Sequence, residues 1–115
     1  MLDHSERPWG RWIKTDEGNG FWVKKIEVNP GGKLSLQKHT GRSEVWTVVQ
    51  GNGTVTLNDT SIVVRAGSVI QIGVGDIHRI ENTTNTIPLL FIEVALGTDL
   101  REDDIIRIED DYGRA

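Results

Sequence analysis

The chain of 115 residues contains no cysteine. Without thiols it can form neither a disulfide framework nor a thiolate metal site, and a cysteine nucleophile is excluded as well. Long apolar runs are also missing, since stretches such as PLLFIEVALG fall far short of the ~20 residues that a transmembrane helix needs. The N-terminal MLDHSERPWG lacks the apolar segment of a secretory signal. These absences predict a cytoplasmic protein.

The chain has fewer basic than acidic residues, with 13 Lys and Arg against 17 Asp and Glu and a net charge of -4. A negative balance disfavours nucleic acid and anionic membranes as partners. A chain of this length is expected to fold as one domain around a single core. We expect that domain to cover residues 1–115, with its core over about 7–98 and a C-terminal arm over about 99–115.

Turn-forming residues are abundant, and 13 glycines separate short runs rich in Val, Ile, Thr and Trp. This spacing is typical of short strands joined by turns. The predicted strands are Gly10–Lys14, Phe21–Val28, Lys33–His39, Glu44–Gln50, Thr54–Leu57, Ser61–Val64, Ser68–Ile72, Ile77–Glu81 and Leu89–Leu96. Short strands without crossover helices predict an all-β sandwich or barrel of the jelly-roll type.

The two ends of the chain are less well determined by pattern. His4 is assigned to a loose N-terminal segment. In the C-terminal DLREDDIIRIEDDYGR, the apolar residues fit neither the helical period nor the strand period well. The arm is therefore predicted to be either a short helical turn or an extended segment packed on the barrel.

Polar side chains that bind metals recur at strand positions. Gln37 and His39 point to the same face of a strand because side chains alternate along it. If that strand forms a hairpin with the next one, Glu44 approaches both, and His78 arrives from far along the chain. Buried groups of this kind are costly unless they are paired. Two imidazoles with one carboxylate, with or without the amide, form a mixed N/O set that suits a transition metal better than Ca²⁺.

The spacing of these residues resembles the cupin family. The first stretch reads G-x5-Q-x-H-x4-E-x6-G from Gly31 to Gly51, with Gln37 where cupins usually have His. The second reads G-x5-G-x-G-x2-H-x3-N from Gly67 to Asn82. The resemblance implies a cupin double-stranded β-helix, a jelly-roll barrel that usually pairs into a homodimer. It also implies one divalent metal ion (Zn, Mn, Fe, Co or Ni) held by Gln37, His39, Glu44 and His78.

Within the cupins, the chain resembles the C-terminal domain of type II phosphomannose isomerases. The matching pieces run from Arg7 to Arg114 and read RPWG, VKKIEVNPG, LSLQKH, RSE, HRIEN, PLLFIEV and EDDIIRIEDDYGR. Such domains often follow a mannose-1-phosphate guanylyltransferase domain. The resemblance implies that a small sugar phosphate is the partner, and that mannose 6-phosphate and fructose 6-phosphate are interconverted through an enediol.

The same resemblance suggests roles for further residues. Arg42 and Arg107 fall on positions expected to contact substrate or phosphate, and Lys25 and Arg79 are additional candidates for substrate binding. Glu93 is the first candidate for the catalytic base, which makes Arg42 and Glu93 the expected catalytic pair.

Plainer interpretations stand beside these roles. Arg42 is equally well interpreted as a solvated turn residue, and Arg107 as part of a surface ion pair. Lys24 and Lys25 favour an exposed pair on an edge strand. The four tryptophans are more typical of a core than of a sugar platform.

The chain departs from the isomerase pattern at three places near the motifs. Val45 replaces a His, Ala95 replaces a Gln, and Asp99 stands in a usual Tyr-Leu pair. Strand alternation predicts that Val45 points away from Glu44 and leaves the metal set intact.

Two alternatives to an isomerase therefore remain. One is another metal-dependent cupin enzyme, such as a dioxygenase using His39, Glu44 and His78. The other is a non-catalytic module that binds a sugar or sugar nucleotide.

Overall fold

A computed structural model describes residues 3–112, and this part of the chain is built of β-strands joined by turns, with no helix. The strands are β1 (Asp3–Arg7), β2 (Gly10–Gly18), β3 (Phe21–Val28), β4 (Leu36–Lys38), β5 (Ser43–Gln50), β6 (Asn52–Leu57), β7 (Thr60–Arg65), β8 (Val69–Ile72), β9 (His78–Asn82), β10 (Leu89–Leu96) and β11 (Ile106–Glu109). The predicted all-β class is confirmed. Among residues 3–112 there is no helix long and apolar enough to span a bilayer.

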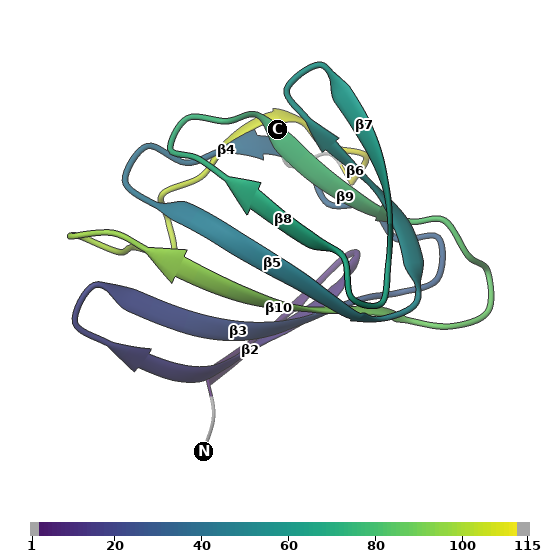
Figure 1. The fold of residues 1–115 in the computed structure, drawn as a ribbon, viewed down its shortest axis with the longest axis horizontal. Helices are drawn as coiled ribbons and strands as arrows, with labels where there is room; N and C mark the ends of the chain where they lie inside the picture. Colours follow the sequence, from purple (N-terminus) through teal and green to yellow (C-terminus); the bar gives the residue numbers. More distant parts are fainter. Residues whose placement is uncertain (1–2, 113–115) are drawn as a thin grey trace.

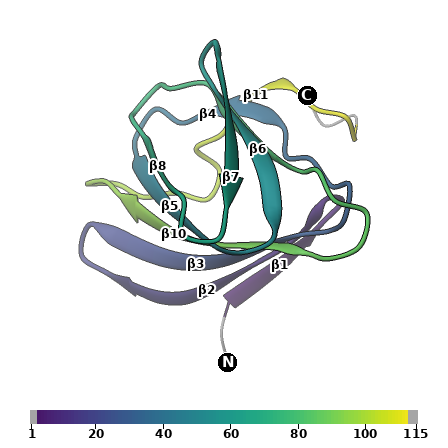
Figure 2. The same ribbon diagram turned by 45° about the vertical axis from the view of Figure 1, so that its right-hand side comes forward.

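The strands form two antiparallel sheets that face each other (Figures 1 and 2). One sheet has the order β1-β2-β3-β10-β5-β8, and the other has the order β11-β4-β9-β6-β7. Burial alternates along β3, β5 and β10, so one face of each strand supplies the core between the sheets. The most deeply buried apolar side chains include Val28, Val48, Val55, Ile80 and Phe91. The polar site described below lies between the same two sheets.

Two long strands were predicted accurately. The bounds of β3 and β10 agree with the predicted Phe21–Val28 and Leu89–Leu96. Both are runs rich in β-branched and aromatic residues, bounded by turn residues, which is the composition typical of strands.

Both ends of the chain join the sheets. The prediction of a loose segment around His4 is wrong, because His4 lies in β1 opposite Ile13 of β2. The sequence of β1, DHSER, is largely exposed, so it carries no apolar alternation that would have revealed the strand. At the other end β11 pairs with β4, which selects the extended alternative for the C-terminal arm.

The hairpin considered between the strand of Gln37 and the strand of Glu44 does not form. β4 pairs with β9 and β11, whereas β5 pairs with β8 and β10 in the opposite sheet. The predicted strand Lys33–His39 is also broken, because Leu34 and Ser35 are both buried and only Leu36–Lys38 is regular strand. Glu44 therefore reaches His39 across the space between the sheets and not along a shared ladder.

The prediction that Lys24 and Lys25 form an exposed pair on an edge strand is wrong as well. β3 is an interior strand between β2 and β10. Lys24 lies on the inner face of β3 and is only 4% exposed. Lys25 lies on the outer face and pairs with Glu27 at 3.4 Å. The distinction matters because the inner face of β3 borders the site.

Candidate metal centre

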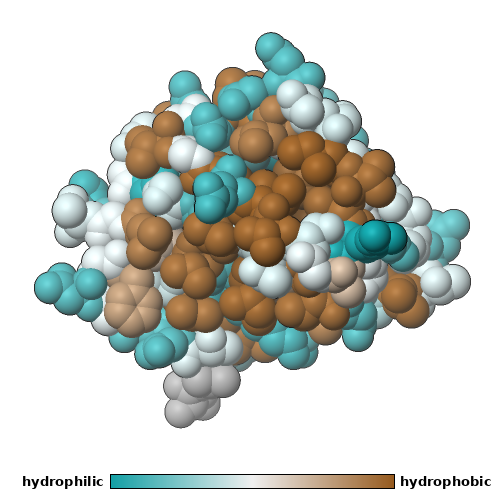
Figure 3. Space-filling model, in the orientation of Figure 1, coloured by the Kyte–Doolittle hydropathy of each residue, from teal (hydrophilic) through white to brown (hydrophobic). Residues whose placement is uncertain are grey.

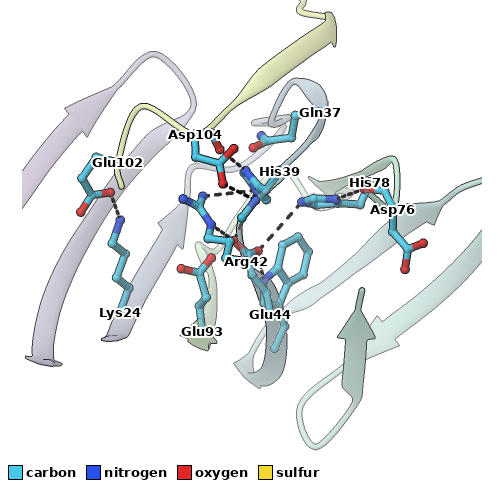
Figure 4. A network of polar contacts seen from close by, with 12 residues as sticks. Lys24, Gln37, His39, Arg42, Glu44, Asp76, His78, Glu93, Glu102 and Asp104 are labelled. Atoms are coloured by element: carbon cyan, nitrogen blue, oxygen red, sulfur yellow. Dashed lines mark hydrogen bonds and ion pairs between the residues drawn. The ribbon is translucent and has the colours of Figure 1, made fainter. Parts of the chain in front are cut away.

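Three buried side chains converge between the two sheets (Figure 4). His39 follows β4, Glu44 lies on β5 and His78 begins β9, and their ligand atoms all lie within 4.8 Å of one another. Each residue is at most 3% exposed. Two imidazoles and one carboxylate at this separation are a set able to hold a divalent transition metal.

Gln37 lies beside this group, since its register partner on β9 is His78. Its amide nitrogen donates to the carbonyl oxygen of Ser35 at 3.3 Å and to the Ser35 hydroxyl at 3.1 Å. These bonds orient the amide and leave its oxygen as the atom that Gln37 would offer a cation. The structure therefore gathers all four residues that the sequence motifs singled out.

Backbone carbonyls decide which nitrogen of each imidazole carries the proton. The Nδ1 of His39 lies 2.6 Å from the carbonyl oxygen of Asp104, and the Nδ1 of His78 lies 2.8 Å from that of Asp76. A carbonyl oxygen only accepts, so each Nδ1 must donate a hydrogen. In the neutral ring this leaves a lone pair on Nε2, which is the arrangement found in histidines that bind metals.

Burial keeps both rings neutral. Together with the neighbouring Arg42 charge, it lowers the pKa of His39 to about 4. Burial is also the main cause that lowers the pKa of His78. Near neutral pH both histidines are therefore ready to act as ligands without first losing a proton.

Electron-rich atoms face each other at the centre of the group. The Nε2 of His39 lies 3.3 Å from Oε2 of Glu44, and the Nε2 of His78 lies 3.9 Å from Oε1. With both Nε2 atoms unprotonated, these are pairs of acceptors in a buried space, an arrangement that a cation among them would relieve. The residues present thus fit a divalent metal ion.

Two donors fix the Glu44 carboxylate from its other sides. Arg42 Nε donates to Oε2 at 2.8 Å, and Trp46 Nε1 donates to Oε1 at 3.0 Å. Arg42 Nη2 also lies 3.3 Å from Nε2 of His39. Arg42 is 7% exposed, so the interpretation of this arginine as a solvated turn residue is wrong.

A second carboxylate lies deeper in the same pocket. Glu93 on β10 is 5% exposed and accepts a hydrogen bond from Trp22 Nε1 at 2.9 Å. Burial and the nearby Glu44 charge together raise the pKa of Glu93 to about 7. A carboxyl group with such a pKa can both take and give a proton near neutral pH.

Of the four basic residues proposed from the sequence, two line the pocket and two do not. Arg42 and Arg107 line the pocket with the metal candidates, and Arg107 lies opposite Gln37 in the register of β11 and β4. Lys25 and Arg79 are not among the residues that line it. Lys25 points outward. Arg79 lies on the face of β9 opposite His78, where its Nε donates to the carbonyl oxygen of Leu34 at 3.0 Å.

Sequence reasoning missed Lys24, which lines the pocket in the place expected for Lys25. Its Nζ lies 3.7 Å from the centroid of the Trp12 ring and 4.4 Å from that of Trp22. It also pairs with Glu102 of the C-terminal arm. A signal was present, because Trp22, Ile26 and Val28 share the parity of Lys24 and form the more apolar face of β3.

Val45 lies on the opposite face of β5 from Glu44, as alternation predicts, and Val94 of β10 is its register partner. Ala95 is fully buried directly opposite Glu44. The replacement at position 45 thus leaves the candidate metal ligands undisturbed, whereas the small side chain at position 95 adjoins one of them.

Characterised relatives are similar to the chain over nearly its whole length. Over 108 residues the chain is 45% identical to the alginate biosynthesis protein AlgA of Pseudomonas aeruginosa, covering 94% of this chain and 22% of AlgA. It is 44% identical to mannose-1-phosphate guanylyltransferase ManC of Salmonella typhimurium, again over 94% of this chain and 22% of ManC. The chain therefore spans about a fifth of the length of these relatives.

Solved structures share the fold at lower identity. The oxalate decarboxylase of Lactobacillus farciminis superposes with a TM-score of 0.78 at 24% identity, over 93% of this chain and 33% of that one. A cupin-superfamily sugar phosphate isomerase from Silicibacter pomeroyi gives a TM-score of 0.68 at 21% identity, over 76% of this chain and 59% of that one. These likenesses establish the cupin double-stranded β-helix.

The family comparison covers nearly the whole chain. The family model described as mannose-6-phosphate isomerase C-terminal matches residues 2–110. This range includes both motifs, every candidate metal ligand and the C-terminal arm through β11. The chain is a cupin domain that belongs to the mannose-6-phosphate isomerase C-terminal family.

Proposed function

We propose that this domain is a metal-dependent isomerase that interconverts mannose 6-phosphate and fructose 6-phosphate. The observation that carries the proposal is the content of one pocket. It is lined by His39, Glu44 and His78, by the buried carboxylate Glu93, and by the basic residues Lys24 and Arg107. Membership of the isomerase C-terminal family supports the choice of substrate. The name of the Silicibacter pomeroyi protein shows that a sugar phosphate isomerase occurs on this fold.

His39, Glu44, His78 and the amide oxygen of Gln37 would hold the metal ion, which is one of Zn, Mn, Fe, Co or Ni. The chemistry supplied by a divalent ion at such a site is polarisation of the sugar carbonyl and stabilisation of negative charge on the enediol oxygens. Arg42 holds the Glu44 carboxylate in place and brings a fixed positive charge to the same region.

Glu93 is the residue proposed to move the proton. It would take the hydrogen at C2 of mannose 6-phosphate as a proton, which leaves an enediolate, and would return that proton to C1. One hydroxyl proton passes from O2 to O1, so the product is fructose 6-phosphate and no atom is gained or lost. A pKa of about 7 suits both halves of this transfer. The hydrogen bond from Trp22 holds the carboxylate in one orientation.

The phosphate group would be bound by cations at the wall of the pocket. Arg107 offers the forked donors that match phosphate oxygens, and Lys24 offers a single compact charge. Lys24 takes the role that the sequence suggested for Lys25, whose side chain is 40% exposed on the outer face. Arg79 is left with a structural role beneath the C-terminal segment, where it lies within 3.7 Å of Asp111 and 3.8 Å of Glu109.

A coupled assay of fructose 6-phosphate formation tests the proposal. The protein is stripped of metal, reloaded with Mn²⁺, Co²⁺, Ni²⁺, Fe²⁺ or Zn²⁺ in turn, and its metal content is measured by elemental analysis. Turnover is expected with at least one ion, and Glu93→Gln should reduce kcat by about 10²–10⁴-fold, the usual contribution of a general base. Stoichiometric metal with no turnover under any loading would contradict the isomerase.

A non-catalytic sugar-binding module is the second candidate. It is favoured by Ala95, which places a methyl group opposite Glu44 where the family has a polar amide. Binding of mannose 6-phosphate or GDP-mannose by calorimetry, without conversion of either, would select this candidate. Ala95→Gln would then be expected to introduce or raise turnover.

We further propose a homodimer. Apolar side chains gather on the face of the molecule where β5, β8 and β10 lie (Figure 3). Val49, Val69 and Leu96 on these strands are 49%, 56% and 47% exposed, and Val63 on β7 is 84% exposed. Exposed apolar side chains that gather on one face are typical of an interface. Sedimentation of wild type and Val69→Lys tests it, and a wild-type monomer at micromolar concentration would refute it.

A further inference from the structure

The segment of residues 101–105, between β10 and β11, touches the candidate site at three separate points (Figure 4). The carbonyl oxygen of Arg101 accepts a hydrogen bond from Arg42 Nη1 at 2.9 Å. The carboxylate of Glu102 pairs with Lys24, and the carbonyl oxygen of Asp104 accepts from His39 Nδ1 at 2.6 Å. Each of the three partners lines the pocket.

Asp104 is the anchor of this segment. Its Oδ1 accepts from the backbone nitrogen and the hydroxyl of Thr40, both at 2.9 Å, and its Oδ2 accepts from the backbone nitrogen of Gly41 at 2.8 Å. Together with the bond from His39 to its carbonyl oxygen, Asp104 makes four hydrogen bonds to three consecutive residues.

These bonds matter because His39 lies outside regular structure. β4 ends at Lys38, so His39 is not held by a strand ladder on both sides. His78, by contrast, lies within β9, and its Nδ1 partner is the carbonyl oxygen of Asp76, only two residues upstream. The ring of one histidine is thus oriented locally, whereas the ring of the other depends on a segment 65 residues away in the chain.

The turn that Asp104 holds has little room to move elsewhere. A Cβ on Gly97, at the end of β10, would lie 2.4 Å from the carbonyl oxygen of Gly41. The end of β10 and the turn at residues 39–41 therefore pack backbone against backbone. The turn thus lies between the end of β10 and Asp104, and in this position the Nε2 of His39 lies 3.3 Å from Glu44.

We propose that Asp104 is the positioning residue of the metal centre. It fixes the turn at residues 39–41 through its carboxylate, and it fixes the tautomer and direction of the His39 ring through its carbonyl oxygen. The C-terminal arm is then a structural part of the site and not a cover over it. This inference rests on the metal site of the proposed function, although its first readout needs no metal.

The test compares Asp104→Asn with Asp103→Asn in the full chain. Both changes remove one negative charge from adjacent positions of the same segment. Asp103 is exposed and makes no side-chain hydrogen bond recorded among residues 3–112, so it is the matched control. Thr40→Val serves as a milder variant, because it removes only one of the four bonds.

The first measurement is NMR of the metal-free proteins. Wild type and Asp103→Asn should show a single Nδ1-protonated tautomer for His39 and a slowly exchanging Gly41 amide. Asp104→Asn should show mixed tautomers for His39 and fast exchange at Gly41, while the His78 signals stay unchanged. A His39 tautomer and Gly41 exchange rate equal to wild type in both Asp104→Asn and Thr40→Val would overturn the proposal.

The second measurement is Zn²⁺ and Co²⁺ affinity by chelator competition. Loss of a residue that orients a metal-binding histidine typically weakens affinity by about 10–100-fold, and this is the effect expected for Asp104→Asn alone. An unchanged affinity in Asp104→Asn would refute the positioning role. Absence of binding in wild type would instead refute the metal site, and the NMR result on Asp104 would still decide the inference.

Discussion

The buried charge of Lys24 is predicted to destabilise the folded protein, so Lys24→Met should raise the free energy of unfolding. The ammonium group is buried on the inner face of β3, at 4% exposure, and burial is the first cause that lowers the pKa of Lys24. Its partners are Glu102, which remains 42% exposed, and the rings of Trp12 and Trp22. The lowered pKa means that these partners do not fully offset the loss of hydration.

The size of the effect follows from what the substitution keeps and removes. Met retains the length and packing of the lysine stem, removes the buried charge, and leaves Glu102 in contact with solvent. Replacing both members of a buried ion pair by apolar side chains of similar volume ranges from neutral to about 1–4 kcal/mol stabilising, whereas a charge left buried without its partner is costly. Neither carboxylate near Lys24 is left in that state, because Glu102 is solvated and Glu93, with a pKa of about 7, can take up a proton. We therefore expect the free energy of unfolding in urea at pH 7 to rise by about 1–2 kcal/mol, within that range. Turnover of mannose 6-phosphate should fall at the same time.

The pH dependence distinguishes this cause from a simple gain in packing. The unfolded chain still binds the Lys24 proton in the interval between the lowered pKa and the ordinary lysine pKa of 10.5, whereas the folded chain has released it. Wild-type stability consequently rises through that interval, because the cost of burying the charge disappears. The advantage of Lys24→Met should therefore be full below the folded pKa and shrink as pH approaches 10.5.

Lys25→Met is the matched control. It lies next to Lys24 on the same strand but on the outer face, with a side chain 40% exposed, so a change within about 0.5 kcal/mol is expected. If Lys24→Met lowers the unfolding free energy at pH 7, or if its advantage does not diminish at high pH, the reasoning about the buried ammonium is refuted.

Three further changes test other parts of the structure. Trp22→Phe removes the hydrogen bond of 2.9 Å to Glu93, so the pKa of that carboxyl should rise and the acid limb of the kcat/KM profile should move to higher pH; an unmoved limb would contradict Glu93 as the base. Phe91→Ala empties a fully buried site against Trp46, where the ring centroids are 4.7 Å apart. It should cost about 3–5 kcal/mol in urea unfolding, and a loss far below this would argue against a tightly packed core. Gly97→Ala places a methyl group 2.4 Å from the carbonyl oxygen of Gly41 and should lower both thermal stability and Zn²⁺ affinity, whereas normal affinity would show that the turn can shift freely.

Much of the fold and of the candidate site was available from the sequence alone, because the relevant signals are local. Runs rich in Val, Ile, Phe and Trp define β3 and β10, and the turn residues between runs define the all-β class. The motif spacing singled out Gln37, His39, Glu44 and His78, since chemistry requires these residue types whatever the sheet around them. Parity along β5 also correctly separated Val45 from Glu44.

Long-range pairing decided the rest. Parity states which residues share a face, but only the partner strands determine which face is inward, and for this reason Lys24 and not Lys25 borders the pocket. The same limit explains why a hairpin of β4 and β5 could be considered although they belong to different sheets. Strand β1 stayed hidden because it is held by backbone pairing and not by an apolar face.

The role of Asp104 is the clearest case of what tertiary structure alone reveals. Nothing in EDDIIRIED distinguishes this aspartate from its neighbours, because its partners lie more than 60 residues away at Thr40 and Gly41. The sequence determined which side chains can bind a metal ion, since that is a property of the residues themselves. Only the folded chain determined how they are aimed, because orientation comes from hydrogen bonds between segments that are distant in sequence.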